Sequence, residues 1–97
     1  MEDIRELAEV LAQIRDPALM ERFLRSILTP SELAEISGRW QLVKMLDQGL
    51  SQRRIAQALG MSLCKITRGS RELKKKNSAF KEVIEGVLPR IKPLVEE

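Results

Sequence analysis

The residues of this 97-residue chain that are best suited to binding chemistry are basic, and they lie in one segment. Between Ser51 and Lys76 there are eight basic residues and one acid, Glu72, so this segment carries +7. The rest of the chain carries −4, because the whole chain is +3. A basic segment on an acidic body favours a polyanion that contacts one defined surface. The alternative is a solvated lysine and arginine face. The basic residues are Arg53, Arg54, Lys65, Arg68, Arg71, Lys74, Lys75 and Lys76.

The chain has few residues suited to catalysis, metal binding or disulfide formation. The chain has no His and a single Cys, Cys64, which removes His-based catalysis, the common zinc sites and an internal disulfide. We therefore expect neither an enzyme nor a metal site. No apolar run approaches the roughly 18 residues of a membrane span, and the N-terminus is acidic and amphipathic. These features predict a cytoplasmic protein with no membrane partner.

The spacing within the basic segment is typical of a helix-turn-helix. Ala56 supplies a small side chain in the first helix, Gly60 a turn residue tolerant of positive φ, and Ile66 a buried anchor in the second helix. An ordinary helical packing unit has the same spacing, so the charge is needed to indicate nucleic acid. The side chains expected to face outward, toward a major groove or phosphates, are Gln52, Arg53, Lys65, Thr67 and Arg71.

Gly69 is unusual in the second of these helices, because a glycine within a helix costs about 1 kcal/mol relative to alanine. Lys65, Arg68 and Glu72 share its helix face at i, i+3 and i+7. One interpretation is a ligand wall with two cations, a bare backbone patch and an acid. The other is an Arg68–Glu72 surface pair beside a glycine that accommodates a neighbouring helix.

The elements that position these residues are predicted to be helical throughout, because the core must be aliphatic: 43% of the residues are apolar and only 3% are aromatic. We expect six helices. The second should be buried on most sides, Thr29 and Glu32 should form a capping box at the start of the third, and Gly49 should end the third. Pro93 should make the tail beyond Pro89 a weak helix at best. The expected helices cover roughly 2–15, 17–28, 30–48, 52–59, 63–76 and 80–88.

Several short motifs resemble the bacterial tryptophan repressor family over roughly residues 19–88. They are Leu28-Thr29-Pro30-Ser31-Glu32, Gly38-Arg39, Leu50-Ser51-Gln52-Arg53 and, most specifically, Ile66-Thr67-Arg68-Gly69-Ser70 followed by Leu73-Lys74.

The resemblance implies an all-α, six-helix intertwined homodimer with helix-turn-helix DNA-reading heads. A single domain would cover residues 1–97, with core helices at about 2–48 and 78–95 and the helix-turn-helix at about 51–76. The implied function is a transcriptional repressor that binds double-stranded operator DNA with L-tryptophan as corepressor. Genes of tryptophan biosynthesis or transport would be its targets, and it would have no prosthetic group.

The resemblance also implies roles for individual residues. Arg39 and Arg68 would sandwich the indole, because guanidinium planes stack on aromatic faces and also bind carboxylates, and Gly69 would admit the ring. Carbonyl groups of Leu28 and Thr29 from the other subunit would accept hydrogen bonds from the ammonium. Lys65 would lie near the carboxylate, and Glu72 replaces a small hydroxyl residue beside the ammonium. The positions that map to the DNA-facing side are Gln52, Arg53, Leu63, Cys64, Lys65, Thr67 and Arg68.

Other functions compete with this interpretation. A helix-turn-helix regulator could bind DNA without a ligand, or could respond to a different small molecule, and tryptophan titration would discriminate these. A helical protein-interaction module would use the acidic body as its contact surface and would show no salt-dependent DNA binding.

Overall fold

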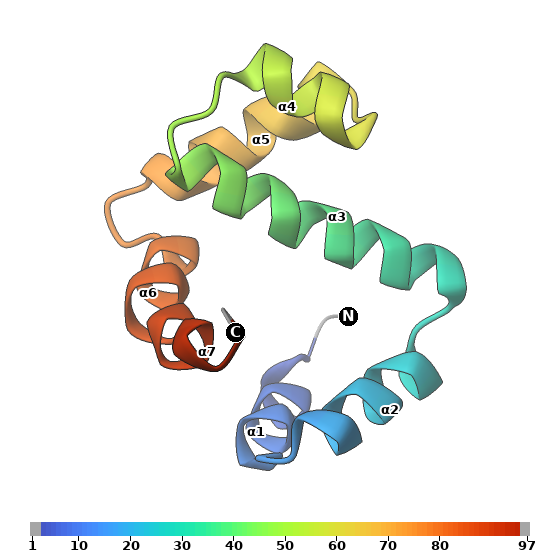
Figure 1. Cartoon of the computed structure of the whole chain (residues 1–97). Helices are drawn as coiled ribbons and strands as arrows, with labels where there is room; N and C mark the ends of the chain where they lie inside the picture. The colour runs from blue at the N-terminus through green and yellow to red at the C-terminus, as the bar shows by residue number, and fades with distance from the viewer. Residues whose placement is uncertain (1–2, 96–97) are drawn as a thin grey trace. The chain divides into compact units, whose positions relative to one another are not determined.

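The computed structural model describes residues 3–95 and the side chains of residues 3–91, and within this range every regular element is a helix. The all-helical prediction is therefore confirmed. Figure 1 shows the order of the helices along the chain. They are α1 (Arg5–Gln13), α2 (Pro17–Ile27), α3 (Pro30–Asp47), α4 (Gln52–Leu59), α5 (Leu63–Lys74), α6 (Ala79–Gly86) and α7 (Leu88–Val95).

The chain folds as two compact units, one up to Ile36 and one from Ser37 onward. The first unit contains α1, α2 and the first turns of α3. Neither α1 nor α2 has a buried residue, and on α2 Leu19 and Ile27 are 42% and 51% exposed. The prediction that the second helix is buried on most sides is wrong for the single chain. Apolar side chains thus remain available on both helices of this unit.

The second unit is built around three aliphatic side chains that come from three different helices. Leu42 of α3, Ile55 of α4 and Ile66 of α5 form its core and are 2% exposed or less. Figure 1 shows α4 and α5 beside the C-terminal half of α3. Burying a side chain of this size stabilises the fold by about 1.5–3 kcal/mol. The partly buried residues packed against this core are Met45, Leu46, Leu50, Ala56, Leu59 and Met61.

The helix ends follow local chemistry. Ser51, Ser62 and Ser78 cap α4, α5 and α6, each accepting a hydrogen bond from the backbone N–H three residues later. Gly49 and Gly60 take left-handed φ values of 91° and 64°, which permits the turns after α3 and α4. These turns fix where α4 and α5 begin.

The predicted capping box at the start of α3 is present. Thr29 N–H donates to the Glu32 carboxylate at 2.8 Å, and Glu32 N–H donates to the Thr29 hydroxyl at 3.1 Å. Two backbone donors that the helix leaves without an internal partner are thereby satisfied.

The C-terminal end differs from the prediction. The helix expected to end near Pro89 ends at Gly86, and a further helix, α7, follows from Leu88 to Val95. Pro89 lies in the first turn of α7, where its missing N–H costs no hydrogen bond. The tail beyond Pro89, for which the sequence predicted a weak helix at best, thus forms a helix in which Pro93 removes a backbone donor.

No helix in the described range 3–95 is long and apolar enough to cross a membrane.

Candidate nucleic-acid interface

The segment with helix-turn-helix spacing forms two packed helices, α4 and α5, joined by the turn at Gly60. Ile55 and Ile66 are completely buried between them and α3, while Ala56, Leu59 and Met61 surround this pair. The packing roles predicted for Ala56 and Ile66 are thus confirmed. With the apolar side used for packing, the polar and basic side chains of the same helices remain on the outside.

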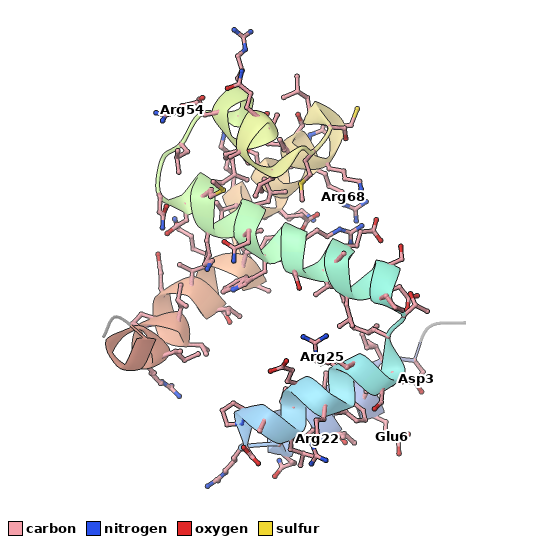
Figure 2. The ribbon with its side chains drawn as sticks, turned by 45° about the vertical axis from the view of Figure 1, so that its right-hand side comes forward. Asp3, Glu6, Arg22, Arg25, Arg54 and Arg68 are labelled. Carbon is pink, nitrogen blue, oxygen red and sulfur yellow. The ribbon has the colours of Figure 1, made fainter. Side chains whose placement is uncertain are left out.

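Two arginines lie in the first turn of α4 and one lysine in the first turn of α5. Arg53 and Arg54 are exposed in the first turn of α4, and Figure 2 shows Arg54 extending outward from that helix. Leu63, Cys64 and Lys65 occupy the first turn of α5 and are also exposed, with Leu63 at 56%. A helix N-terminus carries a partial positive charge, so these side chains and their backbone dipoles both favour an anion.

Two predicted DNA-facing residues contact each other. The Thr67 hydroxyl of α5 donates a hydrogen bond to the Gln52 amide oxygen of α4 at 3.3 Å, and both side chains are half-buried. This bond connects the first residue of α4 to the middle of α5 near the outer surface. Both residues were predicted to lie on the outside, but their contact was not predicted, because no local spacing rule joins residues 15 positions apart.

Gly69 is a point of close approach between α5 and α3. A Cβ at this position would lie 3.0 Å from Leu42 Cδ2 and 3.6 Å from Leu46 Cδ1, and Gly69 itself is buried. Of the two interpretations made from the sequence, the structure favours a glycine that accommodates a neighbouring helix. The bare backbone of Gly69 faces aliphatic side chains of the core.

A second close approach lies one turn earlier on α3. A Cβ at Gly38 would be 2.9 Å from the terminal methyl of Met61, in the turn between α4 and α5. Gly38 and Leu42 are about 6 Å apart along the helix axis, from a rise of about 1.5 Å per residue. The seam between α3 and the helix-turn-helix therefore has glycine backbone on both sides.

The two arginines proposed to bind a ligand are sequence neighbours of these glycines. Arg39 follows Gly38 on α3, Arg68 precedes Gly69 on α5, and both side chains are exposed. Figure 2 shows Arg68 reaching away from α5. An aromatic carboxylate is the kind of ligand that two such guanidinium groups can hold by stacking and charge-assisted hydrogen bonds.

Glu72 has a different partner from the one considered in the sequence. Its carboxylate lies 2.9 Å from the Lys75 ammonium, and the Glu72 side chain is 39% exposed. The alternative Arg68–Glu72 pair is replaced by this contact at i, i+3. A surface pair of this kind contributes only about 0–1 kcal/mol, so Lys75 can be displaced at little cost.

Leu28 and Thr29 lie in the connection before α3, in the first unit. The Thr29 carbonyl accepts a hydrogen bond from Leu33 N–H at 2.9 Å, as the first carbonyl of the helix. A carbonyl oxygen has two lone pairs, so this oxygen retains capacity for a further donor.

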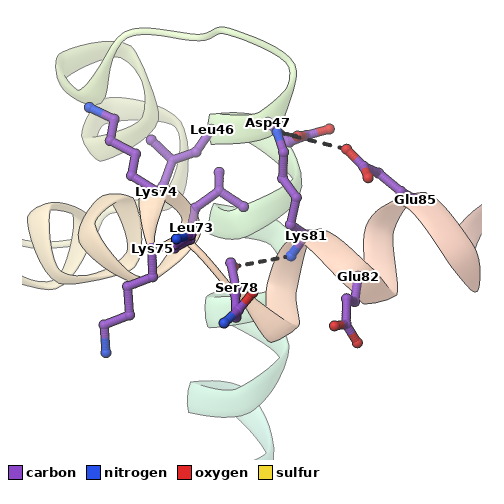
Figure 3. Close-up of a pocket in the computed structure, with 11 residues that line it drawn as sticks. Leu46, Asp47, Leu73, Lys74, Lys75, Ser78, Lys81, Glu82 and Glu85 are labelled. Carbon is purple, nitrogen blue, oxygen red and sulfur yellow. Dashed lines mark hydrogen bonds and ion pairs between the residues drawn. The ribbon is translucent and has the colours of Figure 1, made fainter.

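A polar recess of about 580 Å³ lies where α3, α5 and α6 meet, and Figure 3 shows the residues that line it. Lys81 of α6 crosses it to Asp47 at the end of α3, with Nζ 3.4 Å from the carboxylate. Four lysines and three carboxylates line this recess, so its charge is mixed. The Lys81–Asp47 contact connects the start of α6 to the end of α3.

An all-helical chain whose helix-turn-helix presents basic side chains at both helix starts belongs to the class of DNA-binding regulators. The comparisons with known proteins specify the family. The family profile described as Trp repressor protein matches residues 2–88. The chain belongs to this family, whose members are transcription regulators and not enzymes.

Curated relatives agree with this assignment. A Trp operon repressor homolog of Vibrio parahaemolyticus is 34% identical over 90 residues, covering 92% of this chain and 87% of the relative. Its counterpart in Chlamydia caviae is 34% identical and covers 84% and 82%, and that of Chlamydia trachomatis is 37% identical and covers 67% and 74%. No solved structure matches the chain significantly.

The packing of Gly69 gives a first prediction. Gly69→Ala should lower the free energy of unfolding by about 1 kcal/mol, because overpacking against the fixed, buried Leu42 outweighs the gain in helix propensity. Gly38→Ala is the matched control and should be neutral or stabilising, because the end of the flexible Met61 side chain can move away. Urea unfolding of both variants measures this difference. Equal effects at the two positions would contradict the packing described here.

Proposed function

We propose that this chain is a transcriptional repressor that binds double-stranded operator DNA as a homodimer when L-tryptophan occupies a site at Arg39 and Arg68. Its targets would be genes of tryptophan biosynthesis or transport, in the cytoplasm where bacterial operators lie. The observation that carries the proposal is the pair of exposed arginines beside Gly38 and Gly69, at the seam between α3 and the helix-turn-helix. The family assignment supports DNA as the partner.

The ligand would act on the position of the reading head. An indole between Arg39 and Arg68 contacts α3 and α5 together, so its binding energy favours one placement of α5 relative to α3. Gly69 contributes by allowing α5 close to α3, and Lys65 would add positive charge near the carboxylate. The carbonyls of Leu28 and Thr29 from the partner subunit, together with Glu72, would accept hydrogen bonds from the ammonium.

DNA would be held by the outer surface of α4 and α5. Arg53 at the start of α4 would contact phosphate, where positive charge and the helix N-terminus act together. In α5 the side chains of Leu63, Cys64, Lys65, Thr67 and Arg68 would face the major groove. Phosphate contacts set affinity and orientation, while contacts to base edges set sequence preference.

The ligand-independent and other-ligand alternatives remain distinct candidates. Glu72 is the residue that tests the second of them, because a carboxylate rather than a hydroxyl stands beside the proposed ammonium position. We expect Glu72→Ser to change either the affinity for L-tryptophan or the choice between indole ligands.

Dimerisation is supported by the exposed apolar side chains on α1 and α2. A second copy that covers them would supply burial that the single chain lacks. Sedimentation at micromolar concentration should give about 22 kDa, twice the mass of one 11.1 kDa chain. Ile27→Glu should weaken this association, whereas Ser26→Glu, which adds the same charge one residue away, should leave it unchanged. A folded monomer for the parent chain would refute the dimer.

The phosphate role of Arg53 gives a prediction about salt. Arg53→Ala should weaken binding to all duplexes by a similar factor and reduce the slope of log affinity against log salt by about one. Arg22→Ala, which removes the same charge from α2, serves as the control and should leave the slope unchanged. The measurement is fluorescence anisotropy of labelled duplex DNA over a range of salt. An unchanged slope for Arg53→Ala would place the phosphate contact elsewhere.

The arginine pair predicts a loss of ligand binding. Arg68→Ala and Arg39→Ala should each weaken L-tryptophan binding by about 1–3 kcal/mol, through lost stacking and lost charge-assisted hydrogen bonds. Arg71→Ala, an exposed arginine on the same helix as Arg68, should bind the ligand as the parent does. Titration calorimetry measures all four proteins. If the parent binds no L-tryptophan, the ligand assignment fails and the ligand-independent regulator is favoured.

A further inference from the structure

The hydrogen bond between Thr67 and Gln52 determines what Thr67 can offer to a base. A threonine hydroxyl has one proton and two acceptor lone pairs. Here the proton is directed to the Gln52 amide oxygen at 3.3 Å, so none remains for another acceptor. The hydroxyl oxygen can still accept a hydrogen bond from outside. On the Gln52 side, the amide NH₂ group keeps its two donors.

Thr67 and Gln52 both lie in the part of the helix-turn-helix that is expected to contact DNA. Thr67 is the fifth residue of α5, one turn after the exposed Leu63, and Gln52 is the first residue of α4. Both are half-buried, so one side of each faces the protein and the other faces solvent. The N-terminal half of a recognition helix is the part that reaches base edges in the major groove.

Base pairs differ in which edge atoms donate and which accept. In the major groove, adenine N6 and cytosine N4 donate, whereas thymine O4, adenine N7 and guanine O6 and N7 accept. A freely rotating threonine hydroxyl can bond to either kind. A hydroxyl whose proton is already directed to Gln52 is limited to the donors.

We propose that Gln52 is a positioning residue that makes Thr67 an acceptor toward DNA, so that the base contacted by Thr67 is adenine or cytosine. This inference rests on the proposed DNA-binding function and deepens it, because it specifies the chemistry of one operator position. Gln52 acts through Thr67 and sets sequence preference, in addition to any contact that its NH₂ group makes with phosphate.

The test compares the base preferences of variants. Duplexes are selected from a randomised pool with L-tryptophan present, using the parent chain, Thr67→Val, Gln52→Ala and Gln52→Glu. The base pair read by Thr67 is the one whose preference is lost in Thr67→Val, and the adenine or cytosine of that pair is the base expected to bond to Thr67. Gln52→Ala frees the hydroxyl proton, so thymine and guanine should now be accepted there.

Gln52→Glu separates positioning from simple structural support. A glutamate oxygen still accepts from the Thr67 hydroxyl, so the preference for adenine or cytosine should persist. Affinity should fall for all sequences, because a negative charge is added near phosphates. If Gln52 only held α4 against α5, neither variant would change the base preference, and that result would overturn the inference.

A base analogue checks the contact directly. If adenine is selected, replacing it by purine removes the N6 amino group and should weaken the parent about 3- to 10-fold, the range expected for one hydrogen bond. If cytosine is selected, 2-pyrimidinone removes the N4 amino group with the same expectation. Neither analogue should further weaken Thr67→Val.

Failure of this inference differs from failure of the proposed function. A parent chain that enriches no sequence from the pool contradicts DNA recognition itself, and the inference falls with it. A parent that enriches a sequence but is not weakened when the N6 or N4 amino group of the base pair read by Thr67 is removed contradicts the inference alone. An unchanged base preference in Gln52→Ala also contradicts the inference alone.

Discussion

The structure of the second unit depends on one close contact, between the backbone of α5 at Gly69 and the side chain of Leu42 on α3. Leu42 fills the space that a side chain at position 69 would need, and it packs with Ile55 and Ile66 into the buried core cluster. Once α5 is held against α3 in this way, the rotation of α5 about its axis is fixed. Arg68 and Thr67 then point away from the core.

Local hydrogen bonds, in addition to the apolar core, position α4 and α5. The serine caps and the left-handed glycines fix the starts of α4 and α5, where backbone N–H groups and basic side chains lie together. The Gln52–Thr67 bond then joins the two helices on their outer side. The apolar contact sets which face is presented, and the polar contacts set the direction of individual donors and acceptors.

The sequence predicted the features that depend on neighbouring residues. Gly49, Gly60 and the Thr29–Glu32 capping box act within a few residues, and the structure confirms them. Leu42 was not singled out from the sequence, because α3 has apolar side chains on more than one face. The Gln52–Thr67 bond and the Leu42–Gly69 contact join distant positions, so they require the packing of whole helices to be known. The side chains of α2 are more exposed than predicted. Its sequence pattern indicates an apolar face, but the pattern does not show whether the same chain or a second copy covers that face.

The central claim is that a small ligand at Arg39 and Arg68 controls how well α4 and α5 bind DNA. The most direct measurement is the affinity of the parent chain for a selected duplex with and without saturating L-tryptophan, at one fixed salt concentration. The account predicts at least a fivefold tighter complex with the ligand, about 1 kcal/mol of coupling. Equal affinity under the two conditions would contradict it.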